Sequence, residues 1–249
     1  MEIKENERID DLQRGGLRII QRADAFRFGT DAVLLSHFAS ARRHDRVCDL
    51  GTGTGIIPLL LYGRENTVTA DAVELQPDMA EMAARSMALN GLENVIRIHG
   101  GDLRQIRELL PHDAYDLVTC NPPYGKAGGT LLNPDAAKRL ARHEETCDIA
   151  DVAQAAKWLL RSGGRLCVVF PAARLLELTD ALRACRLEPK RLRLVHSRQD
   201  KQAHLVLLEA MLDARPALIV EPPLVIYQAD GGYTEEMNRI YGIEKGPSL

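Results

Sequence analysis

The sequence predicts an α/β fold, in which a mainly parallel sheet carries helices on both faces and ends in an antiparallel strand. Short apolar runs alternate with helical patterns through the middle of the chain. Such alternation implies right-handed crossovers that place helices on both faces of the sheet. Only residues 196–203 separate the last two predicted strands. That segment is too short for a helical crossover, so we expect these two strands to form an antiparallel hairpin at one edge.

The predicted strands are apolar runs bounded by turn residues. They cover residues 46–49, 68–73, 95–99, 115–120, 165–170, 191–195 and 204–210. The predicted helices cover residues 56–63, 77–90, 103–110, 151–160 and 175–185. Pro77 suits a first helical turn and Gly91 a C-terminal cap, whereas Gly163-Gly164 is expected to stop a helix. We divide the chain into an N-terminal extension (1–45), a core domain (46–212) and a C-terminal extension (213–249).

Composition and charge exclude several classes of protein. The chain has 249 residues, of which 45% are hydrophobic and 27% charged, and its net charge of −3 argues against a globally basic nucleic-acid binder. No apolar run is long enough to cross a membrane, and the charged first residues do not resemble a secretory leader. Five cysteines lack C-x-x-C spacing. We therefore expect a cytoplasmic protein with no disulfide framework and no metal site.

Positive charge gathers in one stretch near the C-terminal end of the core. Between Arg183 and Lys201 there are seven basic residues and two acidic ones. A local basic patch on an acidic protein allows a polyanion to bind at one place. The alternative is an ordinary solvated surface, which a charge run by itself often forms.

The segment Asn121-Pro122-Pro123-Tyr124 follows the predicted strand 115–120. Both prolines fix their own φ and push the preceding residue into extended geometry, so the carbonyl groups point in fixed directions. The Asn121 side chain and the Pro122 carbonyl can accept both hydrogens of a planar amino group, and the Tyr124 ring can cover that plane. A simple strand-ending turn explains the same residues equally well.

A glycine-rich turn follows the first predicted strand. Gly51, Gly53 and Gly55 let the backbone approach a ligand closely, and we expect their N–H groups to point outward. The pyrophosphate fingerprint needs a glycine where Ile56 stands, which disfavours a dinucleotide.

Two acidic residues follow the next two strands. Glu74 ends the second strand, where a carboxylate accepts hydrogen bonds from ribose hydroxyls. Asp102 follows the third strand and can contact a ligand amine. With Gln105 three residues later it fits a helix capping box equally well.

These ordered motifs resemble those of class I S-adenosylmethionine-dependent methyltransferases over about residues 25–210. The resemblance implies a Rossmann-like seven-stranded sheet, S-adenosylmethionine as cofactor, and an N-terminal extension that caps the cofactor. It implies catalytic roles for Asn121, Pro122 and Tyr124 on an exocyclic or amide nitrogen. The residues it places at the cofactor are Asp49 at the ammonium group, Gly51, Gly53 and Gly55 around the methionine part, Glu74 at the ribose, Asp102 and Leu103 at the adenine, and Asn121.

A second resemblance extends nearly from end to end. Residues 26–35, Arg142-His143-Glu144 and residues 233–236 resemble the bacterial family that methylates the N6 amine of an adenine beside the anticodon of a valine tRNA. It implies a tRNA partner and contact of Asp31 with the cofactor, although Asp31 equally suits a helix N-cap. Many members of that family carry an aromatic residue where this chain has Gly125, which weakens one wall of the base pocket that the resemblance implies.

The basic stretch then becomes a candidate for tRNA contact. Arg191 and Arg193 are the residues that we expect to touch the RNA backbone, beside Tyr124 at the base. We expect a monomer or a weak homodimer.

Three alternatives stay open at the level of sequence. A methyltransferase that modifies a glutamine of a protein release factor shares the Asn-Pro-Pro-Tyr motif, but such proteins usually carry a sizeable helical N-terminal domain. A base-amine methyltransferase of ribosomal RNA is the second alternative. The third is an RNA-binding protein of the same fold without turnover.

Overall fold

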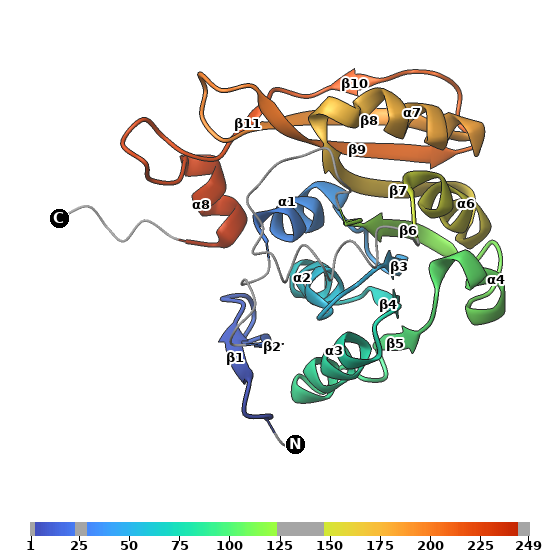
Figure 1. Ribbon diagram of the computed structural model, residues 1–249, viewed down its shortest axis with the longest axis vertical. Coiled ribbons are helices and arrows are strands. Elements are labelled where there is room, and N and C mark those ends of the chain that lie inside the picture. The colour runs from blue at the N-terminus through green and yellow to red at the C-terminus, as the bar shows by residue number, and fades with distance from the viewer. Residues whose placement is uncertain (1–2, 23–28, 124–146, 244–249) are drawn as a thin grey trace.

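The computed structural model describes residues 3–22, 29–123 and 147–243. Within these ranges the chain forms a nine-stranded sheet and a separate two-stranded hairpin. The order across the large sheet is β10-β8-β9-β7-β6-β3-β4-β5, and β11 also pairs with β8 (Figure 1). The strands of the large sheet are β3 (Arg46–Leu50), β4 (Thr69–Glu74), β5 (Ile96–Gly100), β6 (Tyr115–Cys120), β7 (Leu160–Pro171), β8 (Leu187–His196), β9 (Ala203–Leu212), β10 (Ile219–Val220) and β11 (Leu224–Val225).

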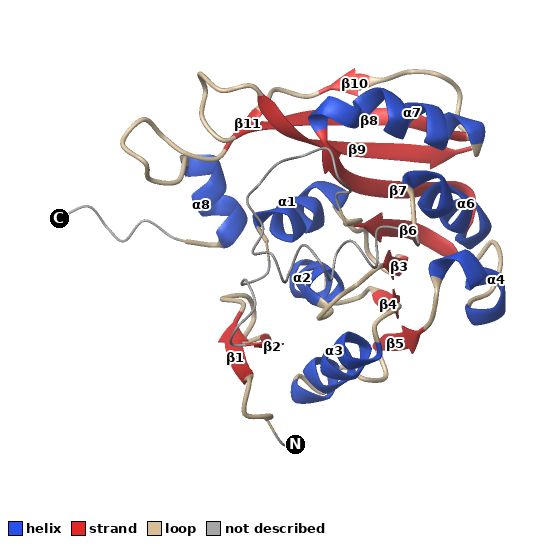
Figure 2. Cartoon of the chain, in the orientation of Figure 1, coloured by secondary structure: helices blue, strands red, loops and turns tan. Residues whose placement is uncertain are grey.

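Helices flank the sheet on both faces, as the alternating pattern predicted (Figure 2). They are α1 (Thr30–Ala39), α2 (Ile56–Arg64), α3 (Pro77–Leu89), η1 (Leu103–Gln105), α4 (Ile106–Leu109), α6 (Ile149–Leu159), η2 (Ala172–Arg174), α7 (Leu175–Ala184) and α8 (Glu235–Tyr241). Each face has its own apolar cluster. One contains buried side chains of α1, α2 and α8, and the other contains those of α6 and α7.

The closing strands confirm the predicted reversal. Strand β9 runs antiparallel to both β7 and β8, whereas the pairs β3–β4, β3–β6, β4–β5 and β6–β7 are all parallel. The expected count of seven strands is corrected to nine in the described part of the chain. The two additional strands, β10 and β11, are each two residues long and pair in parallel with β8, which therefore does not form the sheet edge. Two residues are too few to show a hydrophobic period.

The expected helix stop at Gly163-Gly164 is also corrected. Strand β7 begins at Leu160, directly after α6, and both glycines lie inside it. Leu160 pairs with Tyr115 and Arg165 pairs with Leu117, so β7 bulges between them. Gly163 has φ +77°, and a Cβ on Gly164 would lie 2.8 Å from a backbone oxygen. The glycines are needed for the bulge.

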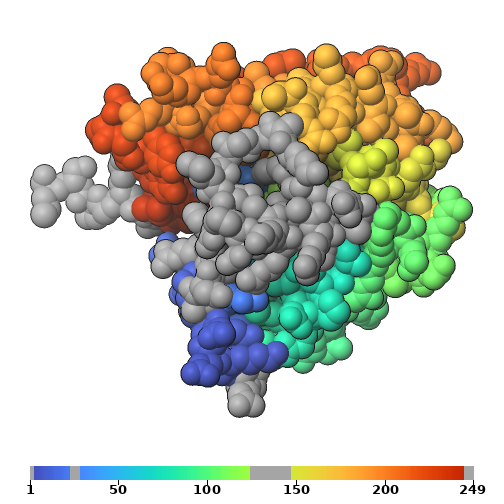
Figure 3. Space-filling model, viewed as in Figure 1, coloured from blue at the N-terminus to red at the C-terminus, as the bar shows by residue number. Residues whose placement is uncertain are grey.

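The hairpin near the start of the N-terminal extension and the helix in the C-terminal extension both pack against the helical layer that contains α1, α2 and α3. The hairpin of β1 (Glu7–Asp11) and β2 (Arg18–Arg22) lies against α3, with an ion pair between Glu7 and Arg85. Helix α8 buries Met237 and Ile240 in the cluster that contains α1. Figure 3 shows α8 in red and the hairpin in dark blue on one side of the molecule. The three-part division of the chain stays a prediction.

Candidate active site

The carboxyl ends of four neighbouring strands bring the predicted site residues to one edge of the sheet. Leu50 at the end of β3 lies opposite both Cys120 of β6 and Val73 of β4, and Glu74 lies opposite Gly100 of β5. The glycine turn, the end of β4, the turn after β5 and the Asn-Pro-Pro segment are therefore neighbours. Open α/β sheets bind their ligands at this edge.

The glycine turn is a tightly bonded loop. Gly51, Gly53 and Gly55 all have positive φ, and a Cβ on Gly55 would lie 2.5 Å from the terminal methyl of Met87. The expectation of outward N–H groups is wrong here, because the Gly51 N–H donates to a backbone carbonyl of β4 and the Gly53 N–H donates to the Glu74 carboxylate. The turn therefore offers a smooth surface for close approach and no array of donors for a phosphate.

Glu74 holds this turn in place. One carboxylate oxygen accepts the Gly53 N–H at 2.8 Å and the other accepts the Gln76 N–H at 2.9 Å, and the residue is only 6% exposed. Each oxygen can accept a second hydrogen bond. Glu74 can therefore shape the loop and still receive the hydroxyls of a ribose. The sequence indicated the second role and not the first.

Asp49 is a buried carboxylate, and only one of its two oxygens has a hydrogen-bond partner in the described residues. Its Oδ1 accepts a hydrogen bond from the Thr119 hydroxyl at 2.6 Å, while Oδ2 has no hydrogen-bond partner in the described part of the chain. Burial raises the pKa of Asp49 to about 7; the hydrogen bond from the Thr119 hydroxyl opposes this rise, and the charge of Glu74 adds a smaller part of it. A buried acceptor without a donor fits an incoming ammonium group. By this criterion the site fits S-adenosylmethionine, whose amino acid part supplies that group.

Asp102 is held by a residue that the sequence did not single out. Its carboxylate accepts the Arg104 backbone N–H at 2.9 Å, and the Arg104 Nε lies 3.0 Å from both oxygens. This hydrogen-bonded ion pair lowers the pKa of Asp102. The side chain therefore caps η1 through Arg104, and not through the capping-box residue Gln105. Leu103 packs against the apolar cluster that contains α6.

The acceptor segment begins directly after β6. Asn121 is half-buried, Pro122 is buried and Pro123 is exposed. Tyr124 and Gly125 lie outside the described residues, as do residues 142–144. The roles predicted for Asn121, Pro122 and Tyr124 stay predictions.

Asp31 lies in the first turn of α1, beside the same edge of the sheet. The N-cap of α1 is Gly29, so the alternative that Asp31 is the N-cap is wrong, and its contact with the cofactor stays a prediction. The Tyr241 hydroxyl lies 3.3 Å from the Thr30 hydroxyl, which ties the C-terminal extension to this end of α1.

The two arginines predicted to touch RNA have internal partners. Arg191 donates to the Phe38 carbonyl at 2.6 Å and pairs with Glu209 at 3.1 Å. Arg193 pairs with Glu236 at 2.8 Å and is 13% exposed. Their contact with RNA stays a prediction.

Comparison with known proteins identifies the family. The family model described as "Methyltransferase small domain" matches residues 23–187, about two thirds of the chain. This chain belongs to the methyltransferase small domain family. Membership confirms the predicted S-adenosylmethionine-dependent methyltransferase, and the mixed sheet with its reversed strand is the fold expected of it.

Relatives of this methyltransferase match over most of both chains. A protein from Tolumonas auensis is 36% identical over 85% of this chain and 86% of its own length, and one from Porphyromonas gingivalis is 33% identical over 89% of each. Both are named tRNA1(Val) (adenine(37)-N6)-methyltransferase. A predicted O-methyltransferase of known structure, protein Atu636 from Agrobacterium tumefaciens, shares the fold with a TM-score of 0.70 and 22% identity, covering 86% of this chain and 96% of its own.

Two features are absent from the described residues of this methyltransferase. None of its helices is long and apolar enough to cross a bilayer. Within the same residues, no three side chains of His, Cys, Asp or Glu gather in a way that could hold a metal ion.

Proposed function

We propose that this methyltransferase modifies the exocyclic N6 amine of an adenine in the anticodon loop of a tRNA, with a valine tRNA as its substrate. The observation that carries the proposal is the position of Asn121 and Pro122, directly after β6 and beside the glycine turn of β3. The names of relatives that match over at least 85% of the chain support the choice of substrate.

The chain's own groups orient the acceptor. S-adenosylmethionine, when bound, supplies an electrophilic methyl group. The Asn121 side chain and the Pro122 carbonyl accept the two amine hydrogens, which favours charge building on that nitrogen. Tyr124 stacks on the base and fixes its plane. Glu74 receives the ribose and Asp49 the ammonium group, so that the methyl and the amine face each other across one edge of the sheet.

Transfer of a radiolabelled methyl group tests the proposal. With tRNA from a strain that lacks the gene, we expect the label to be sensitive to RNase and to elute as N6-methyladenosine after nucleoside digestion. Label in protease-sensitive material would instead support the release-factor alternative. Asn121→Ala is expected to lower turnover by about 10²–10³-fold while cofactor binding is kept. Asn66→Ala, in an exposed turn, is the control and should leave turnover unchanged.

A further inference from the structure

The basic stretch from Arg183 to Lys201 contains one arginine that differs from its neighbours. Six of the seven basic side chains contact acidic side chains or carbonyl groups of the protein. These contacts are Arg183 with Glu188, Arg186 with Asp213, Lys190 with the Arg215 carbonyl, Arg191 with Glu209 and Glu221, Arg193 with Glu236, and Lys201 with Asp200. Within the described ranges, the guanidinium of Arg198 makes no such contact. Arg198 is therefore the member of the stretch that is most available to a phosphate.

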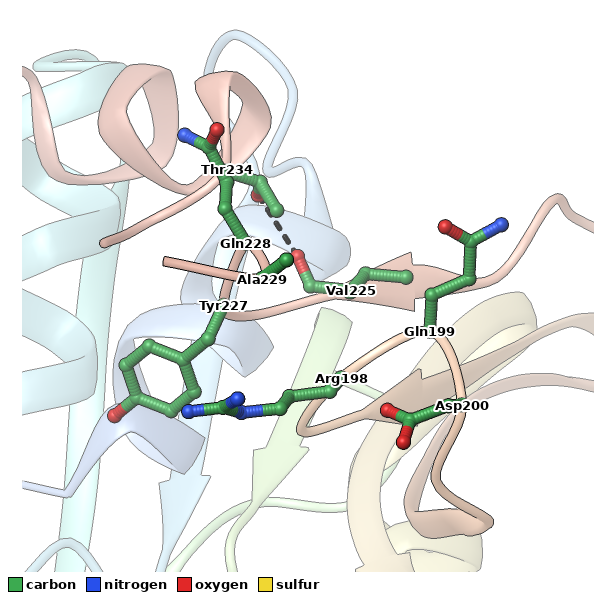
Figure 4. Close-up of a pocket in the computed structure, with 8 residues that line it drawn as sticks. All are labelled: Arg198, Gln199, Asp200, Val225, Tyr227, Gln228, Ala229 and Thr234. Carbon is green, nitrogen blue, oxygen red and sulfur yellow. Dashed lines mark hydrogen bonds between the residues drawn. The ribbon is translucent and has the colours of Figure 1, made fainter. Parts of the chain in front are cut away.

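Arg198 lines a pocket of about 670 Å³. The pocket lies between the tip of the β8–β9 hairpin and the segment that joins β11 to α8 (Figure 4). Its lining residues are Arg198, Gln199, Asp200, Val225, Tyr227, Gln228, Ala229 and Thr234. A volume of this size is ordinary for a small-molecule or single-nucleotide site.

The pocket opens at the same edge of the sheet as the candidate active site. Pro171, at the carboxyl end of β7, lies opposite Leu205 near the start of β9, so the hairpin tip projects beyond that edge. In Figure 1 the hairpin tip and the loop before α8 extend to the side toward which the β6 arrow points. Two strands, β7 and β9, separate β8 from β6. The lateral distance is therefore roughly 15 Å at ordinary strand spacing. A few nucleotides of an unstacked strand span that distance.

Tyr227, which lines the pocket, is the end member of an aromatic stack. Tyr227, Tyr233 and Tyr241 stack in a row, with ring centroids 5.4 Å and 5.3 Å apart and planes within 17° of parallel. Tyr227 ends the row and is 37% exposed. Its outer face has no aromatic neighbour among the described residues. A rigid, partly exposed ring of this kind is a stacking platform for a nucleobase.

Polar groups beside this ring suit the edge of a base. Gln199 is exposed, and the Gln228 amide donates to the Tyr233 carbonyl at 2.6 Å, which holds its oxygen in place. Amide side chains read the edges of bases, whereas a guanidinium binds phosphate. Asp200 also lines the pocket, and its negative charge favours a neutral base inside with the phosphate outside at Arg198.

We propose that this pocket binds a second nucleotide of the RNA substrate, a base that stacks on Tyr227 with its phosphate on Arg198. The inference rests on the proposed function and adds a subsite that fixes the RNA next to the methylated adenine. It also moves the expected RNA contact from Arg191 and Arg193 to Arg198.

Direct binding of a fluorescein-labelled anticodon stem-loop RNA, followed by anisotropy, tests the subsite without relying on methyl transfer. Arg198→Gln is expected to weaken binding about tenfold and to make the salt dependence shallower by about one phosphate contact. The matched control is Arg186→Gln, which changes the same charge at a paired, exposed site and should stay within twofold.

Tyr227→Leu should weaken binding to a similar degree, and Tyr227→Phe should restore it, since only the ring is needed for stacking. Methylation assays with Arg198→Gln and Tyr227→Leu should show a raised KM for RNA, an unchanged kcat and an unchanged affinity for S-adenosylmethionine.

Two results would overturn the subsite. One is Arg198→Gln and Tyr227→Leu binding RNA as the control does, which leaves the proposed function intact if the wild-type protein still methylates adenine. The other is a wild-type protein that binds no RNA, which removes the subsite and the proposed function together.

Discussion

Buried carboxylates occur in two regions of this protein, and their surroundings differ. Asp45 and Glu209 lie 3.0 Å and 3.2 Å from the guanidinium of buried Arg165, and Glu209 also pairs with Arg191. Asp49 lies four residues after Asp45, yet it has one hydrogen bond and an oxygen without a partner in the described residues. Arg165 also donates to the last carbonyl of α1, so the paired group fastens that helix to β7 and β9.

The difference separates a structural charge from a functional one. Transferring a carboxylate from water into a protein interior costs several kcal/mol unless charges and hydrogen bonds compensate it. The group around Arg165 supplies that compensation within the chain itself. At Asp49 the chain compensates the cost of burial only in part. This is the state expected of a carboxylate whose remaining partner is a positively charged ligand.

The largest effect is expected where the paired group is broken. Arg165→Met leaves Asp45 and Glu209 buried with fewer partners, and we expect the free energy of unfolding to fall by about 3–5 kcal/mol. Urea unfolding followed by circular dichroism measures it. Arg161→Met is the control on the same strand, because Arg161 pairs with Asp116 but is 63% exposed, and it should cost less than about 1 kcal/mol. Equal losses in the two variants would contradict the distinction.

The opposite result is expected for Asp49→Asn. The variant removes a buried charge and keeps the shape, so the ligand-free protein should be at least as stable as the wild type at pH 7 and above. Binding of S-adenosylmethionine should weaken about 100-fold, or about 2.7 kcal/mol, in isothermal titration calorimetry. Asp113→Asn, at an exposed position, should change neither quantity. Binding within threefold of the wild type would remove Asp49 from the cofactor site.

The sequence predicts those features of the two carboxylate regions that depend on local residue patterns. Strand ends, the glycine turn and the acids at the ends of β3 and β4 and after β5 are all visible in the residue order, since parallel strands bring their carboxyl ends together. The partners of the buried charges around Arg165 are not visible in the residue order. Arg165 and Glu209 are far apart in the chain, and no periodicity shows that they meet. For the same reason the sequence indicates Arg191 and Arg193 as RNA contacts without showing that folding pairs them with Glu209 and Glu236.

The raised pKa of Asp49 makes both the stability of the protein and its cofactor affinity depend on pH. Its pKa is about 7 in the folded protein against a usual value of 3.8, so the unfolded chain releases this proton first. Stability should therefore decline as pH rises from about 4 to 7, and Asp49→Asn should lack that contribution. Cofactor affinity should instead increase as pH rises. The ionised carboxylate attracts the ammonium group, so binding should weaken about tenfold between pH 8 and pH 6. Calorimetry across this range tests it, and a slope unchanged in Asp49→Asn would show that another group titrates.

The smallest effect concerns Asp102, which has features of both kinds of carboxylate. It is paired like Asp45, but its partner Arg104 is 42% exposed and belongs to the same turn. Solvent screens an exposed pair of this kind, so a ligand amine can displace Arg104 at small cost. Arg104→Gln frees the carboxylate and should tighten binding of S-adenosylmethionine about threefold. Binding of a cofactor analogue that lacks the exocyclic amine of adenine should not change.

Arg174→Gln is the control for this last change, because it breaks a similar exposed pair with Glu177 on another helix and should leave both affinities unchanged. If Arg104→Gln instead weakens binding of the cofactor and not of the analogue, Arg104 holds Asp102 in its binding orientation. Asp102 would then belong with Asp45, as a carboxylate that the chain itself completes, and Asp49 would remain the one whose partner must come from the ligand.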